Sequence, residues 1–357
     1  MNAAEYPFRI ENLSIRNYKG IDALDIEFPL SPIAGSPDVV AIGSRNGVGK
    51  SSVLECCALL LAIPRLFDKG DDKISFGGVD DIIRAGAEVA HVKGRVTSGD
   101  NKSTAILAFE RDGETVAVKD RNGIFDESLA SFGDPWHRII RDNMVAHILG
   151  QVSDPVRIPN GLLFHSFRRV SGTHVESDAI LRSPGVYEAG DFDEEYSMNV
   201  FKSIVLRKMM YEKGLIEDSS SRRDQGRVLM VLNDIIERYA GGKLGRLRPL
   251  AGNGYDIRID PGGRAKSFTI NGLSSGQMEV ISTLFLIWHA TRDMPSVVLI
   301  DEPELHLNAE WHGEFVSSLV ESAPQNQYVL ATHSEDVMAS VAPECRIILT
   351  REDASPE

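Results

Sequence analysis

Apolar and polar side chains alternate through residues 8–28 of this 357-residue chain, and the alternation is interrupted near Lys19 and Gly20. A period of two is typical of half-buried strands, so we expect a hairpin there. After a polar loop, residues 39–42 form an apolar run that enters a glycine-rich segment, and residues 51–62 continue as an apolar stretch typical of a buried helix. The chain is therefore expected to open with a strand hairpin, a strand, a glycine-rich turn and a helix.

The periodicity changes twice farther along the chain. Three alternating runs between residues 89 and 119 predict an antiparallel meander that packs as a lobe beside the core, and residues 187–240 follow a helical period in short segments. The remaining pattern alternates between strands and helices: strands at 255–259 and 267–270, a helix at about 276–290, a strand at 297–300, a helix at 309–322 and a strand at 328–331. Such an alternation indicates a parallel sheet with helical crossovers.

Composition agrees with an ordinary globular protein, with 42% hydrophobic and 25% charged residues. No stretch approaches the roughly 18 apolar residues of a membrane span, and the first residues do not resemble a secretory signal. Cys56, Cys57 and Cys345 lie in apolar surroundings and are interpreted as reduced core residues. We expect a cytoplasmic protein that does not engage a membrane.

The formal net charge of −14 argues against a surface that coats nucleic acid as a whole. Local basic clusters leave a smaller anion-binding patch open, and the alternative is that they are solvated loop charges. The clusters are Arg168 with Arg169, Arg222 with Arg223 and Arg227, and Lys243 with Arg246 and Arg248.

Residues 43–52, GSRNGVGKSS, lie between a predicted strand and a predicted helix, which is the setting of a phosphate-binding loop. Glycines let backbone N–H groups surround phosphates, Lys50 adds a positive charge, and the Ser51 hydroxyl can bind magnesium. Ser44 stands where the strict pattern has glycine, and the alternative is a glycine-rich turn that contains a lysine. The predicted nucleotide-binding residues are Asn46, Gly47, Val48, Gly49, Lys50, Ser51 and Ser52.

An apolar strand over residues 297–300 ends in Asp301 and Glu302. Ligands gather at the carboxyl ends of parallel strands, so Asp301 is predicted to hold magnesium and Glu302 to activate the attacking water as a general base. The alternative is that both acids only decorate the turn before Pro303.

Two further motifs complete the predicted site. The segment LSSGQ at 273–277 opens a helix whose N-terminus favours anions, which makes Ser274, Ser275, Gly276 and Gln277 predicted nucleotide contacts, supplied across an interface with a second subunit. The alternative is a serine cap of a core helix. His333 follows the strand at 328–331 and is predicted to contact the γ-phosphate, whereas His306 and His312 are interpreted as ordinary polar positions.

The motif order NGVGKSS, LSSGQ, VVLIDEPELHL and ATHS, together with the opening hairpin, resembles ABC-type ATPases of the RecF, SMC and OLD (overcoming lysogenisation defect) group. The resemblance implies an α/β P-loop head with a mixed sheet core, an antiparallel β lobe and an inserted helical subdomain. It divides the chain into residues 1–186, 187–245 and 246–357. It also implies ATP and Mg²⁺ as cofactors, a dimer or higher homo-oligomer with composite ATP sites, and Lys50, Glu302 and His333 as catalytic residues.

The resemblance also implies further correspondences. It implies that Arg16 or Lys19 lies near the nucleotide and that Gln151 is the glutamine beside the metal. It also makes Arg168 or Arg169 a candidate for an arginine close to the nucleotide. The sequence departs from relatives at Asn308-Ala309 and at Glu335, which remove no catalytic group. About 25 residues follow His333, so we expect no TOPRIM nuclease domain in the chain.

Four functions fit these motifs. The first is a regulatory ATPase whose ATP-driven dimer controls a separate effector, such as a nuclease, in prokaryotic antiphage defence or DNA processing. The others are a RecF-like ATPase that binds DNA directly, the ATPase subunit of a membrane transporter, and a scaffold that binds ATP with slow turnover.

Overall fold

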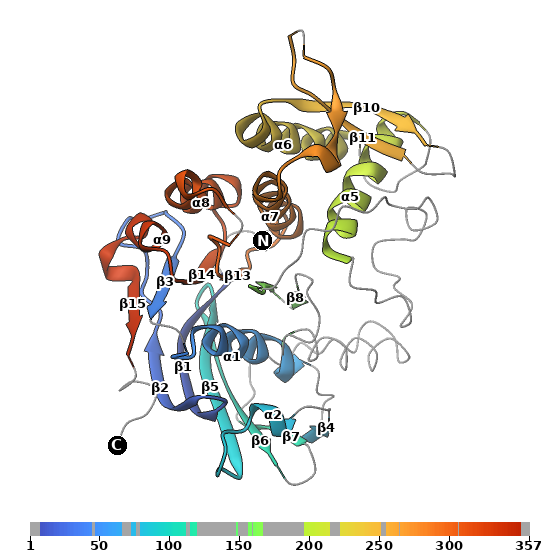
Figure 1. Ribbon diagram of the computed structural model, residues 1–357. Coiled ribbons are helices and arrows are strands. Elements are labelled where there is room, and N and C mark those ends of the chain that lie inside the picture. Colours follow the sequence, from blue (N-terminus) through green and yellow to red (C-terminus); the bar gives the residue numbers. More distant parts are fainter. Residues whose placement is uncertain are drawn as a thin grey trace. The chain divides into compact units, whose positions relative to one another are not determined.

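A computed structural model describes residues 8–44, 47–65, 73–75, 79–111, 115–119, 148, 156–158, 160–166, 196–214, 222–250, 255–263, 265–305 and 307–350. The chain forms two compact units, drawn with their elements labelled in Figure 1. Unit 1 comprises residues 1–167, 291–305 and 309–357, and unit 2 comprises residues 168–290 and 306–308. The domain boundaries expected from the sequence stay a prediction.

An antiparallel sheet in unit 1 has the strand order β2-β1-β5-β6-β7-β4. The expected opening hairpin and the expected meander are both present, and β1 joins them into one sheet because its second edge pairs with β5 over Phe8↔Ser98 to Arg16↔His91. The strands are β1 (Phe8–Tyr18), β2 (Ile21–Glu27), β4 (Lys73–Ser75), β5 (Val89–Ser98), β6 (Asn101–Glu110) and β7 (Thr115–Lys119).

A second sheet in unit 1 has the order β15-β3-β14-β13-β9-β8. All neighbours are parallel except β8 and β9, so the sheet core is mixed, as expected. Every residue of β13 and β14 is buried, which explains their continuous apolar runs. The strands are β3 (Val39–Ser44), β8 (Val156–Ile158), β9 (Gly161–Phe164), β13 (Val297–Asp301), β14 (Gln327–Thr332) and β15 (Arg346–Leu349).

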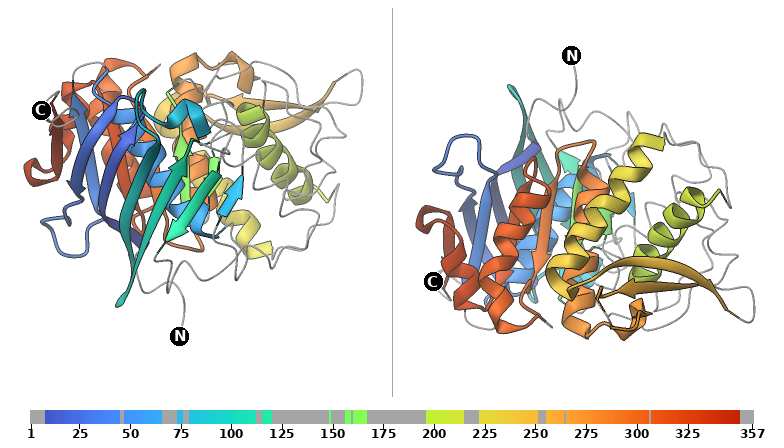
Figure 2. Two further views of the ribbon diagram at one scale, coloured as in Figure 1. Left: turned by 90° about the horizontal axis from the view of Figure 1, so that it is seen from below. Right: turned by 90° about the horizontal axis from the view of Figure 1, so that it is seen from above.

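Helix α1 (Lys50–Ala62) contacts strands of both sheets, and every residue from Val53 to its end is buried. A helix covered on all sides is apolar around its whole circumference, which accounts for the sequence VLECCALLLA. Helices α8 (Ala309–Ser322) and α9 (Glu335–Ser340) lie together over the parallel sheet in the view from above (Figure 2). Short helices α2 (Val79–Ile82), η1 (Ile63–Arg65) and η5 (Pro343–Cys345) complete the described part of unit 1.

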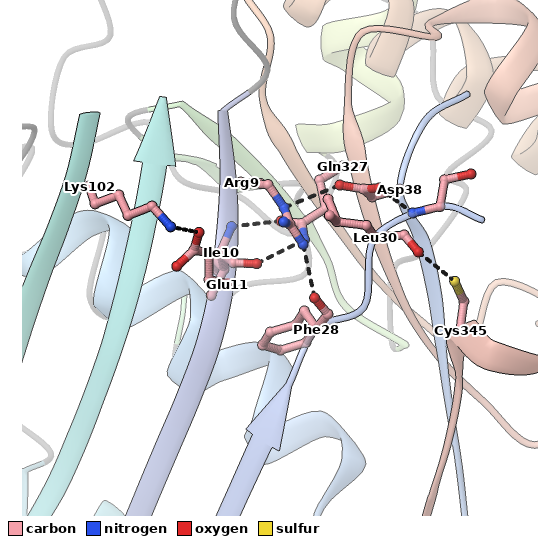
Figure 3. Close-up of polar contacts among 10 residues, drawn as sticks. Arg9, Ile10, Glu11, Phe28, Leu30, Asp38, Lys102, Gln327 and Cys345 are labelled. Carbon is pink, nitrogen blue, oxygen red and sulfur yellow. Dashed lines mark hydrogen bonds and ion pairs between the residues drawn. The ribbon is translucent and has the colours of Figure 1, made fainter. Parts of the chain in front are cut away.

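Polar side chains tie the first strand of the antiparallel sheet to the parallel sheet (Figure 3). The buried Gln327 of β14 accepts a hydrogen bond from the backbone N–H of Ile10 at 2.8 Å and donates one to its carbonyl oxygen at 3.0 Å. Arg9 pairs with Asp38 at 3.2 Å and donates to the carbonyl oxygen of Phe28 at 2.9 Å. Because β2 pairs with β1 only from Asn12 onward, Gln327 replaces the missing ladder at Ile10.

Unit 2 contains helices and a small antiparallel sheet of order β10-β11-β12. The edge-to-face contact of Phe201 and Phe285, with ring centroids 5.5 Å apart, joins two of its helices. The charged run at Lys243, which the sequence analysis treated as loop, is the edge strand β10. The elements are α5 (Tyr196–Glu212), α6 (Arg222–Ala240), α7 (Ser275–Thr291), β10 (Lys243–Pro249), β11 (Tyr255–Asp260), β12 (Phe268–Thr269) and η4 (Ile270–Gly272).

The three cysteines are free and buried, as expected. Burial raises the pKa of the Cys56 and Cys57 thiols well above that of an exposed cysteine, so both stay protonated and unreactive at neutral pH. No helix in the described ranges is both long and apolar enough to cross a membrane.

Candidate nucleotide site

Three loops of unit 1 meet at one edge of the parallel sheet. In the sheet order, β14 lies between β3 and β13, and all three strands point the same way. Thr332 is level with Gly43, and Asp301 is level with Ala331. The glycine-rich loop, the Asp301–Glu302 pair and His333 therefore leave the sheet side by side, as the alternation of strands and helices predicted.

The glycine-rich loop owes its shape to two left-handed residues. Gly47 has φ 80° and Gly49 has φ 98°, values that L side chains rarely adopt. A Cβ atom on Gly49 would also lie 2.9 Å from Cγ1 of Ile21, at the start of β2. Val48 is buried, Ser51 is exposed, Ser52 is half-buried, and Asn46 lies outside the described residues. The loop thus combines a fixed backbone with an accessible Ser51.

Lys50 is the buried cation of the site, with 6% of its surface exposed. Its Nζ donates a hydrogen bond to Oγ of Ser44 at 3.2 Å and lies 2.7 Å from Nε2 of His333. Ser44, the departure from the strict glycine pattern, therefore supplies a lysine contact. Burial lowers the pKa of Lys50, although three negative side chains oppose the shift, namely Asp301, Glu302 and Glu304.

The two acids after β13 lie in different environments. Asp301 is buried with 4% exposure, whereas the side chain of Glu302 is 33% exposed, and its Oε1 lies 4.0 Å from Nε2 of His333. Glu302 has φ 48°, a left-handed conformation that is costly for a residue with a Cβ atom. Its N–H donates to the carbonyl oxygen of Ala331 at 2.7 Å, which holds the strained residue against β14. Strain of this kind is common at functional sites.

The oxygen groups of Ser51 and Asp301 fit a magnesium ion bound together with a nucleotide. Magnesium prefers oxygen ligands and usually keeps several waters while taking one or two protein groups plus substrate phosphates. Within the described residues, no cluster of three His, Cys, Asp or Glu side chains has the arrangement of a protein-only metal site. A hydroxyl beside Lys50 and a carboxylate at the end of β13 match the sparse donor set that the nucleotide-bound ion needs.

Glu304 is a site residue that the sequence analysis missed. Its Oε2 accepts a hydrogen bond from Oγ1 of Thr332 at 2.7 Å, and its Oε1 accepts from the backbone N–H groups of His333 at 2.7 Å and Ser334 at 3.2 Å. The available signal was a third carboxylate in the segment DEPE, two residues after Glu302.

The LSSGQ segment begins α7 in unit 2. Ser274 Oγ accepts from the N–H of Gln277 at 3.2 Å, and Gln277 Oε1 accepts from the N–H of Ser274 at 3.0 Å, which is a reciprocal capping box. Gln277 Nε2 also donates to the carbonyl oxygen of Tyr239, at the end of α6. Ser275 is exposed and Gly276 is buried. The capping alternative is therefore present in the structure, and the exposed Ser275 leaves the predicted nucleotide contact open.

The structure places some of the residues in the further correspondences and leaves others outside the described ranges. Arg16 pairs with Asp25 at 2.7 Å, and Lys19 pairs with Glu55 of α1 at 2.6 Å, so both cations already have partners in unit 1. His312 Nδ1 lies 3.2 Å from Oγ of Ser334, which makes it a neighbour of the His333 loop. Gln151, Arg168, Arg169 and His306 lie outside the described residues.

Comparisons with known proteins identify relatives of this chain. Residues 191–339 match the family model described as an AAA domain, putative AbiEii toxin, Type IV TA system. The Septu protein PtuA of Bacillus mycoides (strain KBAB4) is 22% identical over 361 residues, covering 96% of this chain and 41% of the relative. The chain thus spans about two fifths of the length of that curated relative.

Among solved structures, an SMC head bound to the C-terminal winged-helix domain of ScpA has a TM-score of 0.53 at 18% identity, covering 93% of this chain and 91% of that one. The recombination mediator RecF in an ATPγS-type complex has a TM-score of 0.49 at 12% identity, with 97% of each chain covered. The likeness to the SMC head shows that the chain has the fold of that head.

Proposed function

We propose that this chain, an ABC-type ATPase of the RecF and SMC group, hydrolyses ATP with Mg²⁺ and uses ATP-driven dimerisation to control a separate effector protein in the cytoplasm. The observation that carries the proposal is the convergence of Lys50, Glu302 and His333 at the carboxyl ends of three adjacent strands.

Each side chain at this edge has a distinct chemical task. Lys50 and the backbone N–H groups of residues 47–52 bind the phosphates, and Ser51 and Asp301 hold Mg²⁺, which supplies charge neutralisation at the phosphates when bound. Glu302 accepts the proton of the attacking water, a role for which its partial exposure leaves room. His333, whose Nε2 lies 2.7 Å from Lys50 Nζ, would donate a hydrogen bond to the γ-phosphate.

Dimerisation is proposed because the chain carries a second anion-favouring segment, the LSSGQ start of α7, in addition to the phosphate loop. Ser275 is exposed at the N-terminus of α7, where backbone N–H groups and the helix dipole favour an anion. One ATP would therefore be enclosed between the phosphate loop of one copy and the Ser275 region of a second copy. ATP then acts as the link between protomers, and hydrolysis releases it.

The biological role is proposed from the likeness to Septu PtuA and to a family model named for a toxin. Both fit prokaryotic antiphage defence, with a nuclease as the class of effector. DNA processing is the neighbouring possibility. In either setting, the ATP state of the dimer would decide when the effector acts.

Glu302→Gln tests the catalytic assignment. We expect retained ATP binding, at least about 100-fold slower hydrolysis and an accumulated dimer, because the variant loses only the proton acceptor. Glu314→Gln, an exposed acid on α8, is the matched control. ATP turnover and light scattering measure both effects, and normal turnover of Glu302→Gln would show that the base is assigned wrongly.

Lys50→Ala should abolish ATP binding, and an unchanged affinity for ATP would refute the assignment of the phosphate-binding loop.

Direct DNA binding is the second candidate, and strand β10 favours it. Arg246 and Arg248 are exposed on this edge strand, and within the described residues neither guanidinium has a hydrogen bond or an ion pair. The double variant Arg246→Glu/Arg248→Glu should weaken ATP-dependent binding to a DNA duplex. The slope of log K against log salt concentration should become shallower by the amount expected for the loss of about two phosphate contacts. Identical salt slopes for both proteins would rule out this candidate.

A further inference from the structure

The turn after β13 carries an acidic residue that contacts the loop after β14. Residues 302–305 close into a turn in which the N–H of Leu305 donates to the carbonyl oxygen of Glu302 at 3.0 Å. Pro303 restricts the backbone of this turn. The turn directs the Glu304 carboxylate at Thr332, His333 and Ser334, where it accepts one hydroxyl and two backbone hydrogen bonds.

These hydrogen bonds fix the backbone at His333 itself. The exposed imidazole contacts Lys50, whereas the backbone N–H of His333 donates to Glu304 Oε1. On the other side, Ser334 caps α9 by accepting from the N–H of Val337 at 3.3 Å. Because the backbone is held at His333 and at Ser334, the imidazole can move only by rotation about its side-chain torsions. The position of His333 relative to Glu302 therefore depends on a carboxylate two residues after Glu302.

We propose that Glu304 is a positioning residue that couples the loop of Glu302 to the loop of His333, so that both side chains face the γ-phosphate together. The inference rests on the proposed function, because it assigns Glu304 to the same site. Glu304 touches neither the nucleotide nor the attacking water in this proposal. It acts by holding the backbone of His333 in place. A hydrogen bond to a charged acceptor suits this task because it is stronger than one between neutral groups.

A different role must be separated from this one. The negative charge of Glu304 also acts on Lys50, where it favours the charged lysine. Glu304→Gln removes the charge but keeps an amide oxygen that can accept from both backbone N–H groups, and its NH₂ group can donate to Thr332. Glu304→Ala removes the charge and the acceptors together. The pair of variants therefore separates the positioning of the His333 loop by hydrogen bonds from the effect of the negative charge on Lys50.

Steady-state ATP hydrolysis with the full chain tests the proposal. Glu304→Ala should lower kcat about 10- to 100-fold with less than about a threefold change in ATP affinity, because misplacement by about 1 Å can cost about 100-fold. Glu304→Gln should stay within about fivefold of the parent. Glu314→Ala, on α8, serves as the control for loss of a nearby exposed acid. Equal loss in Glu304→Gln and Glu304→Ala would overturn bracing in favour of charge.

A double-mutant comparison shows whether Glu304 acts through His333. If it does, Glu304→Ala should add less than about a twofold loss in a His333→Ala background, since residues that act as a unit are not additive. A full further loss in that background would overturn the proposal.

Hydrogen exchange of the nucleotide-free chain provides a readout that does not depend on activity. The amide of His333 should exchange at least about tenfold faster in Glu304→Ala than in Glu304→Gln, because the alanine variant removes its acceptor, whereas the Ser334 amide keeps Thr332 Oγ1 at 2.9 Å and should change less. An unchanged exchange rate of the His333 amide would overturn the proposal that Glu304 positions this loop. If His333→Ala hydrolyses ATP normally, the proposed function of His333 fails, and the exchange result still decides whether Glu304 fixes the loop.

Discussion

The two left-handed glycines of the phosphate loop allow a paired test of how the loop is built. Gly47→Ala and Gly49→Ala each place a methyl group on a backbone with positive φ, at 80° and 98°. They differ in surroundings: a Cβ on Gly47 has nothing within 4 Å, whereas one on Gly49 lies 2.9 Å from Cγ1 and 3.0 Å from Cδ1 of Ile21. The pair therefore separates backbone strain from crowding.

The magnitudes follow from these contacts. A left-handed conformation costs an L-residue about 1–2 kcal/mol, so Gly47→Ala should destabilise the protein by that amount. Crowding against a packed side chain typically adds about 1–3 kcal/mol, which brings Gly49→Ala to about 2–5 kcal/mol. Both variants should also weaken ATP binding, because the loop directs its N–H groups only in the glycine conformation.

Urea unfolding of the parent, of the three single variants Gly47→Ala, Gly49→Ala and Ile21→Ala, and of the two double variants that combine Ile21→Ala with each glycine change measures these terms. Ile21→Ala should destabilise the protein by about 1–3 kcal/mol less in the Gly49→Ala background than in the parent, because the crowding is relieved. In the Gly47→Ala background its cost should equal that in the parent within about 0.5 kcal/mol. Equal coupling of Ile21 to both glycines, or equal costs of the two glycine variants, would refute the reasoning.

Two further predictions concern the buried polar groups of unit 1. Gln327→Met should cost about 2–5 kcal/mol in urea unfolding, because it leaves two buried backbone groups of Ile10 without partners. Gln325→Met, at the half-exposed position two residues earlier, should cost less than about 1 kcal/mol, because the Thr291 carbonyl oxygen that Gln325 contacts also accepts from the N–H of Met294; similar costs for the two variants would contradict the link between the sheets. The lowered pKa of Lys50 means that the folded chain binds fewer protons than the unfolded chain between that pKa and about 10.4, so the stability of the parent relative to Lys50→Met should rise with pH across this window. A flat or falling difference between the two unfolding curves would contradict the shift.

Much of the fold was predictable because its elements have clean periods. The opening hairpin, the meander and the strands before Asp301 and His333 were found from local patterns that burial then confirmed. The joining of hairpin and meander into one sheet was not predicted, because pairing between β1 and β5 connects residues about 80 positions apart and leaves no local signal. Strand β10 was missed because its cations, including Arg246, follow an exposed edge rather than a buried face.

The site shows the same division between local and distant information. Lys50, Asp301 and His333 follow from short motifs whose spacing reflects the chemistry of phosphate binding. Glu304 could not be singled out, because its partners are backbone N–H groups 29 and 30 residues away, and a backbone donor has no sequence identity. Likewise, the engagement of Lys19 by Glu55 depends on how β1 packs against α1.

The capping box at α7 narrows which signature residues can meet a nucleotide. Gln277 uses its oxygen for the N–H of Ser274 and its amide for the carbonyl oxygen of Tyr239, so a phosphate contact from Gln277 would have to break one of these bonds. The exposed Ser275 hydroxyl carries no such cost, and the helix N-terminus beside it already favours anions. In the proposed dimer, Gln277 therefore fixes the start of α7 relative to α6, and Ser275 with the neighbouring backbone makes the contact to the partner's ATP.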